Sequence, residues 1–128
     1  MSLKSKGINA ERDLIHKFWA VDWAASRVAG SGSTKYPAPD ILAGNTLRKL
    51  VIECKVTKQK IQYFSKKEVE ELQQYATMFG AEPWCAIKFD RDKWYFLTFE
   101  DLKDSGKSYS VSRDLAKMKG LSFEEIIK

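Results

Sequence analysis

The chain has 128 residues, of which 22 are Lys or Arg and 17 are Asp or Glu, so its formal net charge is +5. This length allows one compact domain over 1–128 and leaves little room for a second. The hydrophobic fraction of 44% is too high for a disordered chain. No run of residues approaches the roughly 18 consecutive apolar positions of a membrane span, so we expect a globular domain without a membrane partner.

Cysteine and histidine usage narrows the chemistry further. Cys54 and Cys85 each lie in an apolar run, which indicates buried thiols of a reducing compartment and not a disulfide framework or a zinc cluster. Residues 1–7 have no apolar core, so we expect no secretory signal and an intracellular, cytoplasmic location. The single histidine, His16, excludes a site with several His ligands. An active site would therefore be built from acids and lysines.

The positive charge is concentrated in the N-terminal half. Residues 1–64 contain 11 basic and 5 acidic side chains, whereas residues 65–128 contain 11 basic and 12 acidic ones. A basic face gains free energy on a polyanion through counterion release, so this half is a candidate nucleic-acid surface. Many soluble domains are mildly basic, however, and charge alone leaves this question open.

The predicted first helix spans Asn9 to about Ala20 and follows residues 1–6, which we expect to be a flexible basic arm. The apolar side chains of this helix recur at the spacing of an amphipathic helix and are Leu14, Ile15, Phe18 and Trp19. Glu11 falls on the same stripe, so its carboxylate faces inward and needs a partner. Alternatively, Glu11 lies in the first helical turn and only complements the helix dipole or stays in water.

A strand and a long loop come next. Residues 23–29 are predicted to form a strand that ends near Arg27 and Val28. Residues 30–39 contain Gly, Ser and Pro at positions that exclude regular structure, and loops of this length are often functional. Their glycine spacing does not match a phosphate-binding P-loop.

Two strands after this loop bring three ionisable side chains together. Asp40 opens a short strand over 40–44, and the clearest strand of the chain, 50–56, follows after a turn. The period of two places the even-numbered apolar residues of 50–56 on one face and Glu53 and Lys55 on the other. In a tight hairpin, both carboxylates and the lysine amine converge within a few ångströms.

The second predicted helix spans residues 65–79. Ser65 is the expected N-cap, Glu68 completes a capping box three residues later, and Gly80 ends the helix. Its apolar positions follow 3, 4, 3 spacing, which is typical of a core or subunit contact.

The rest of the chain completes the predicted sheet. Residues 83–89 and 94–99 are apolar at almost every position, which is typical of strands covered on both faces. Residues 100–128 are the least clearly assigned, with 109–111 extended and 121–127 helical. The element order predicts an α/β fold at the α+β boundary, with a mixed central β-sheet of about five strands flanked by helices.

The set of Asp40, Glu53 and Lys55 suits phosphodiester hydrolysis assisted by a divalent metal. Carboxylate oxygens are hard ligands for Mg²⁺, which polarises the phosphate and lowers the pKa of its bound water. A lysine beside the metal orients or deprotonates the attacking water and offsets the charge that builds on phosphorus. The pattern Asp-x(n)-Glu-x-Lys alone is weakly specific. Here the predicted hairpin supports it, because it would place the three side chains close together.

Four ordered motifs resemble a known family. They are GINAERDLI at 7–15, RVAGSGS at 27–33, PDI at 39–41 and IECKV at 52–56. Together they look like the archaeal-type Holliday junction resolvases, which are relatives of the type II restriction endonucleases. The resemblance runs from about Lys6 to Phe99, and the C-terminal thirty residues match only loosely. It implies a restriction-endonuclease-like fold.

The resemblance also implies roles for the site residues. Asp40 and Glu53 would be metal ligands together with the backbone carbonyl of Cys54, and Lys55 would be the catalytic lysine. Glu11 would be an additional essential carboxylate that holds or orients a second ion or its water. The expected metal is Mg²⁺, with Mn²⁺ as a substitute.

The same resemblance implies partners. Such enzymes are homodimers that cut two opposing strands of a four-way DNA junction, which they choose by shape. Ser31 would approach the cleaved strand. The residues expected to contact DNA are Lys4, Lys6, Arg12, Arg27, Ser31 and Lys35, and those expected at the dimer interface are Tyr75 and Phe79. The open alternatives are a related nuclease that acts on a flap, mismatch or duplex, and a DNA-binding module without catalytic activity.

Overall fold

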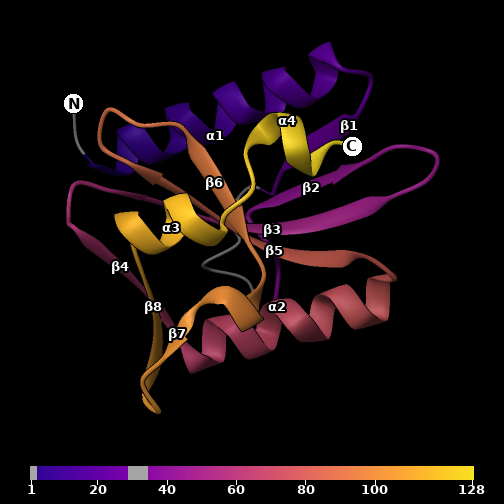
Figure 1. The fold of residues 1–128 in the computed structure, drawn as a ribbon. Coiled ribbons are helices and arrows are strands. Elements are labelled where there is room, and N and C mark those ends of the chain that lie inside the picture. The colour runs from indigo at the N-terminus through magenta and orange to yellow at the C-terminus, as the bar shows by residue number, and fades with distance from the viewer. Residues whose placement is uncertain (1–2, 29–34) are drawn as a thin grey trace.

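A five-stranded sheet lies between two long helices in the computed structural model, which describes residues 3–28 and 35–128 and their side chains from residue 5 onward (Figure 1). The strand order is β1-β2-β3-β5-β6, and only the β3–β5 pair is parallel. These strands are β1 (Ala24–Arg27), β2 (Ile41–Gly44), β3 (Lys49–Thr57), β5 (Glu82–Phe89) and β6 (Trp94–Leu97). The helix α1 (Leu3–Ala20) covers one face and α2 (Lys66–Phe79) the other. The predicted mixed sheet flanked by helices is confirmed.

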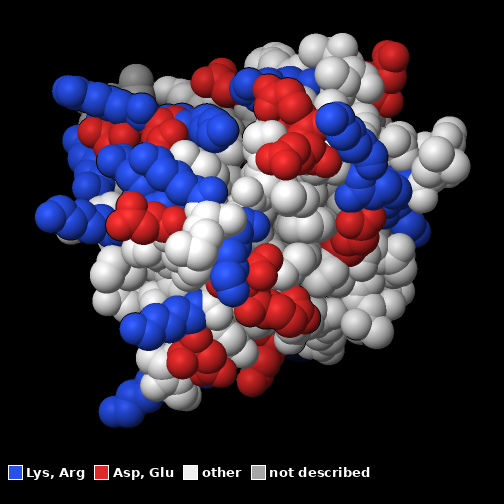
Figure 2. Space-filling view, viewed as in Figure 1, with Lys and Arg blue, Asp and Glu red and all other residues white. Residues whose placement is uncertain are grey.

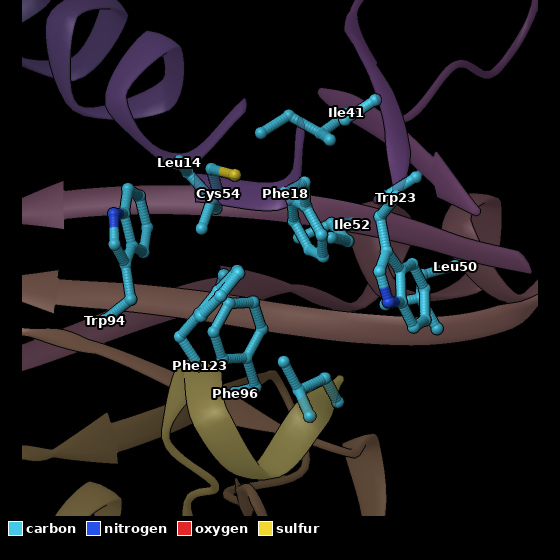
Figure 3. Close-up of a cluster of buried hydrophobic side chains, with 14 residues drawn as sticks. Leu14, Phe18, Trp23, Ile41, Leu50, Ile52, Cys54, Trp94, Phe96 and Phe123 are labelled. Carbon is cyan, nitrogen blue, oxygen red and sulfur yellow. The ribbon is translucent and has the colours of Figure 1, made fainter. Parts of the chain in front are cut away.

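The two faces of the sheet bury separate apolar clusters. Leu14 and Phe18 of α1 pack with Ile52 of β3, and Phe123 closes this cluster from the C-terminal segment (Figure 3). The other cluster joins α2 to the opposite face of β3 through Val51. Because successive strand residues point to opposite faces, β3 contributes to both clusters.

A second, three-stranded sheet was not predicted from the sequence. Its order is β4-β8-β7, with β4 (Ile61–Ser65), β8 (Ser108–Ser112) and β7 (Lys103–Asp104). In β4 the apolar side chains of Ile61 and Tyr63 are exposed and only Phe64 is buried, so the sequence does not alternate between polar and apolar residues. The predicted extended segment 109–111 falls within β8 and is confirmed.

Three short helical elements complete the C-terminal part. They are the 3-10 turn η2 (Phe99–Asp101), α3 (Arg113–Lys119) and α4 (Phe123–Ile126). The strand predicted over 94–99 ends at Leu97 because η2 begins at Phe99, and the helix predicted over 121–127 is the shorter α4. Ser112 and Ser122 are the N-caps of α3 and α4 through bonds from Leu115 N and Glu125 N.

The first helix begins earlier than predicted. It starts at Leu3 and not at Asn9, so residues 3–6 are helical and the prediction of a flexible arm over 1–6 was wrong for them. Gly7 weakens the helical signal of this segment, which explains the misplaced start. The new start places Glu11 in the middle of α1. The alternative in which Glu11 complements the dipole from the first turn is therefore wrong.

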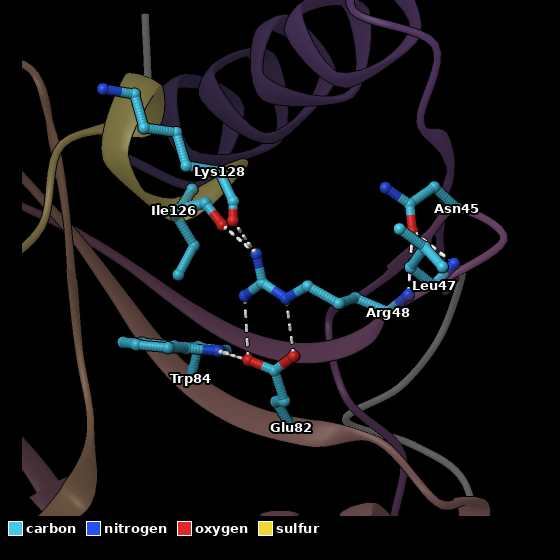
Figure 4. A network of polar contacts seen from close by, with 7 residues as sticks. All are labelled: Asn45, Leu47, Arg48, Glu82, Trp84, Ile126 and Lys128. Carbon is cyan, nitrogen blue, oxygen red and sulfur yellow. Dashed lines mark hydrogen bonds and ion pairs between the residues drawn. The ribbon is translucent and has the colours of Figure 1, made fainter.

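Arg48 connects the turn between β2 and β3 to the C-terminal end of the chain (Figure 4). Its guanidinium donates two hydrogen bonds to the Glu82 carboxylate at 2.8 and 2.9 Å, and Nη1 donates to the carbonyls of Ile126 and Lys128. The Arg48 bonds lower the pKa of the Glu82 carboxyl. This bidentate pair anchors the hairpin that carries the candidate site. No helix in the described part of the chain is long and apolar enough to cross a membrane.

Candidate active site

The β2–β3 hairpin fixes the position of Asp40. Antiparallel pairing of Ile41 with Ile52 places Asp40 beside the following residues of β3. The Asp40 backbone N–H donates to Ile52 O at 3.0 Å, and the Asp40 Oδ2 accepts from Cys54 N at 2.8 Å. The carboxylate is therefore held by the backbone of β3, and Asp40 lies immediately before β2, whereas the sequence predicted that it opens this strand.

Glu53 lies against Asp40, and the two carboxyl groups share a hydrogen bond. Burial, followed by the negative charge of Asp40 and this hydrogen bond, raises the pKa of Glu53 to about 9. The nearby Lys55 ammonium opposes the shift only in part. Two adjacent carboxyl groups form a donor set that a hard divalent cation fits, because its charge would offset theirs.

Cys54 stands between Glu53 and Lys55 on the strand, but its side chain points to the opposite face, into the cluster under α1. Burial, with nearby carboxylates, raises the pKa of the Cys54 thiol far above its ordinary value. A thiol that keeps its proton is a poor metal ligand. Any donor atom from this residue would therefore be the backbone carbonyl.

One cavity of about 360 Å³ contains the predicted pair of carboxylates and the lysine. Asp40, Glu53 and Lys55 line it, and Lys35 stands at the same cavity beside the ring of Tyr36. The remaining lining residues are Pro37, Ala38, Lys67, Glu68, Glu71 and Leu72. The predicted convergence of Asp40, Glu53 and Lys55 is thus found, and the cavity is wide enough for a phosphate group and water.

Glu11 approaches the site from the α1 side. Its carboxylate forms an ion pair with Arg27 at 3.3 Å, which is the partner that an inward acid requires. Burial, and secondarily the charge of Asp40, raises the pKa of Glu11, while Arg27 opposes this. The described residues contain no cluster of three or more His, Cys, Asp or Glu side chains arranged to hold a metal. Glu11 therefore stands beside the pair of Asp40 and Glu53 without forming one ligand set with it.

Two of the other residues expected to contact DNA lie on α1. Arg12 is exposed on α1, and Lys6, one and a half turns before Glu11, lies beside Lys58. The Lys58 ammonium lowers the pKa of Lys6. Figure 2 shows Lys and Arg side chains gathered, among acids, along the edge where α1 begins. Ser31 and the side chain of Lys4 lie outside the described residues.

Sequence reasoning missed two residues of this region, Glu68 and Lys58. Glu68 was assigned to a capping box with Ser65, and half of that box is present, since Glu68 N donates to Ser65 Oγ at 3.0 Å. The carboxylate instead reaches Lys55, with 2.9 Å between Lys55 Nζ and Glu68 Oε2. The sequence contained one signal for Glu68, which is its position in the first turn of the helix predicted after the strand of Glu53 and Lys55. It contained no signal for Lys58 beyond the charge of this residue.

Tyr75 and Phe79 lie together at the end of α2, with ring centroids 5.7 Å apart. Phe79 and Met78 are 43% and 81% exposed, which is unusual for large apolar side chains. Phe79 also lines an open, mainly apolar groove of about 730 Å³ together with Trp19 and Trp23. This surface is a candidate protein contact.

Comparison with known proteins gives a consistent result. The family model described as archaeal Holliday junction resolvase (Hjc) matches residues 2–128. A crossover junction endodeoxyribonuclease Hjc from Archaeoglobus fulgidus is 41% identical over 97% of this chain and 90% of its own length, and one from Methanocaldococcus jannaschii is 30% identical over 95% and 86%. The solved structure of Archaeoglobus fulgidus Hjc, a Holliday junction resolvase from an archaeal hyperthermophile, superposes with a TM-score of 0.88, at 38% identity over 95% of this chain and all of that one. The chain therefore belongs to the archaeal Holliday junction resolvase family.

Proposed function

We propose that this protein is a structure-selective endonuclease that cleaves four-way DNA junctions by Mg²⁺-dependent phosphodiester hydrolysis. The observation that carries the proposal is the convergence of Asp40, Glu53 and Lys55 in one cavity of a chain that belongs to the resolvase family. A module that only binds DNA gains nothing from two carboxylates where a phosphate must sit, because they repel it.

Asp40, Glu53 and the backbone carbonyl of Cys54 would hold the metal ion. The placement of Asp40 and Glu53 in one cavity supports this assignment, because a divalent cation there would offset the charge of two adjacent carboxylates. Mg²⁺ suits oxygen ligands, and Mn²⁺ would substitute. When bound, the ion would polarise the phosphate and lower the pKa of the attacking water.

Lys55 and Glu11 would act on the reacting groups from two sides. The Lys55 ammonium would stabilise the charge that develops on the phosphate and orient the attacking water. Glu11 would hold or orient a second ion or its water, and its ion pair with Arg27 supports a fixed position for this carboxylate. Both Glu11 and Lys55 lie close to Asp40 or Glu53, which is the geometry that these roles require.

The DNA backbone would be bound by basic side chains together with one serine. The residues proposed for this contact are Lys4, Lys6, Arg12, Arg27, Ser31 and Lys35. Lys35 lines the cavity itself, so it would contact a phosphate next to the cleaved bond. Phosphate contacts of this kind fix the position of the substrate without reading its sequence.

We further propose that the protein acts as a homodimer through the surface around Tyr75 and Phe79. The exposed apolar side chains at the end of α2 support this, since a contact between two copies would remove them from water. A two-fold axis would place two sites in a fixed relation, as cleavage of two opposing strands requires.

A panel of DNA substrates tests the proposed function. The panel consists of an immobile four-way junction, a flap, a mismatch and a plain duplex, each incubated with Mg²⁺, Ca²⁺ or EDTA. We expect cleavage of the junction in Mg²⁺ only, and no cleavage by Asp40→Asn, which should still bind the junction in Ca²⁺. Faster cleavage of plain duplex than of the junction would favour a nuclease for another DNA form. Unchanged activity of Asp40→Asn would contradict the assigned site.

A further inference from the structure

Glu68 projects from the first turn of α2 toward the candidate active site. It lines the same cavity as Asp40, Glu53 and Lys55. Its Oε2 lies 2.9 Å from Lys55 Nζ, and this ion pair joins α2 to the strand that carries the site. The family resemblance assigned no role to this residue.

Both carboxylate oxygens of Glu68 are held in place. Oε1 accepts a hydrogen bond from the Ser65 hydroxyl at 3.3 Å. Oε2 is shielded from solvent, and its contact with the Lys55 ammonium is an ion pair without hydrogen-bond geometry. A shielded carboxylate oxygen is costly without a counter-charge, so the pair resists separation. The N–H groups of Lys55 are not committed to Glu68 and can serve a phosphate.

We propose that Glu68 is a positioning residue that holds the Lys55 ammonium at the cavity shared with Asp40 and Glu53. Lysine has a flexible four-carbon stem whose freedom is lost when the amine is fixed at one place. Glu68 restricts this freedom before substrate binds, so the side-chain entropy of Lys55 is lost on folding and not on binding. The effect on cleavage rests on the proposed function, whereas the restraint on Lys55 does not.

Glu71 provides a matched control on the same helix. It lines the same cavity, but its ion pair is with Lys67, at 3.8 Å, and not with Lys55. Glu71→Gln therefore removes the same charge from the cavity without releasing Lys55. Glu68→Asp keeps the charge but withdraws the carboxylate by one methylene. The N-cap bond of α2 uses the backbone N–H of Glu68, so these side-chain changes leave it intact.

The first measurement needs neither metal nor DNA. The amine of Lys55 is labelled with acetic anhydride in the folded, metal-free protein, and its labelling rate is measured by peptide mass spectrometry. We expect faster labelling of Lys55 in Glu68→Gln and Glu68→Asp than in the wild type, and the wild-type rate in Glu71→Gln. Equal labelling rates in all four proteins would overturn the proposal, whether or not the protein cleaves DNA.

The second measurement is the single-turnover cleavage rate of a four-way junction at saturating enzyme and Mg²⁺. We expect Glu68→Gln and Glu68→Asp to be slower by roughly 10- to 100-fold, the scale of a misplaced catalytic group, with junction affinity in Ca²⁺ unchanged. A faster Glu68→Gln would mean that Glu68 holds Lys55 away from the phosphate, which overturns positioning. Equal losses in Glu68→Gln and Glu71→Gln would show a general charge effect and would also overturn it. Absence of cleavage by the wild type would refute the proposed function instead.

Discussion

The two faces of β3 differ sharply in chemistry although they belong to one strand. On the α1 face, Leu50 and Ile52 are fully buried in an apolar cluster. On the α2 face, Val51 is buried in the same way. The next two residues on this face are Glu53 and Lys55, which line the candidate site. Because successive residues of the strand point to opposite faces, residues that stabilise the fold alternate with residues that line the candidate site.

The two faces of β3 also differ in their contribution to stability. The α1 face gains free energy by removing apolar surface from water. The α2 face brings Glu53 next to Asp40, and the resulting rise in the pKa of Glu53 means that its ionised form is disfavoured in the folded protein. The site is thus a local cost to stability that the apolar face offsets.

The largest effect is expected on the polar face. Glu53→Gln keeps the size of the side chain but removes a proposed metal ligand, so cleavage of a four-way junction in Mg²⁺ should fall by about a thousandfold or more, on the scale of the several kcal/mol that a metal ion contributes. Single-turnover cleavage measures this, and binding in Ca²⁺ shows that the variant is intact. Glu71→Gln is the control for loss of one charge from the cavity. Cleavage by Glu53→Gln near the wild-type rate would contradict the division between the faces.

The next effect is expected on the apolar face. Ile52→Ala removes fully buried methyl and methylene groups and should lower the free energy of unfolding by about 2–5 kcal/mol, against about 0.5–1.5 kcal/mol for Ile52→Val. Urea unfolding at one pH measures both. The cleavage rate per folded molecule should stay within about threefold of the wild type, because the side chain points away from the cavity. A loss of cleavage comparable with that of Glu53→Gln would show that the two faces are not separable.

The sequence predicted the polar face well because its signals are local. Strand alternation placed Glu53 and Lys55 on one face, and the short turn before β3 brought Asp40 beside them. Those inferences need only the backbone geometry of one hairpin. The inward orientation of Glu11 was predicted from helical spacing, but its partner Arg27 was not, because that contact joins α1 to β1.

What could not be predicted depends on contacts between distant segments. The sheet of β4, β8 and β7 pairs Phe64 with Tyr109 from a distant segment, and although polar and apolar residues alternate in β8, they do not in β4. The ion pair of Glu68 with Lys55 was missed for a similar reason, since the local pattern with Ser65 indicates only the cap, which is present. Local patterns do not record the partners that a side chain finds in another element.

A further effect is expected in the pH dependence of stability without metal. In the folded protein the pKa of Glu53 is about 9, against an ordinary value of 4.5. Below pH 4.5 the folded and unfolded states are both protonated at this residue, so its contribution is fully present there. As pH rises toward 9, the unfolded state loses the proton first, and the free energy of unfolding falls by up to about 1.4 kcal/mol per pH unit.

Urea unfolding in EDTA at pH 6 and pH 8 measures this slope in the wild type and in Glu53→Gln, which has no titrating group at position 53. We expect the wild type to lose more stability than the variant between the two pH values. Ca²⁺ at pH 8 should restore stability to the wild type and much less to the variant, because only the wild type offers the ion two adjacent carboxylates. Equal slopes in the two proteins would mean that Glu53 is already ionised when folded, and the polar face would then carry no stability cost.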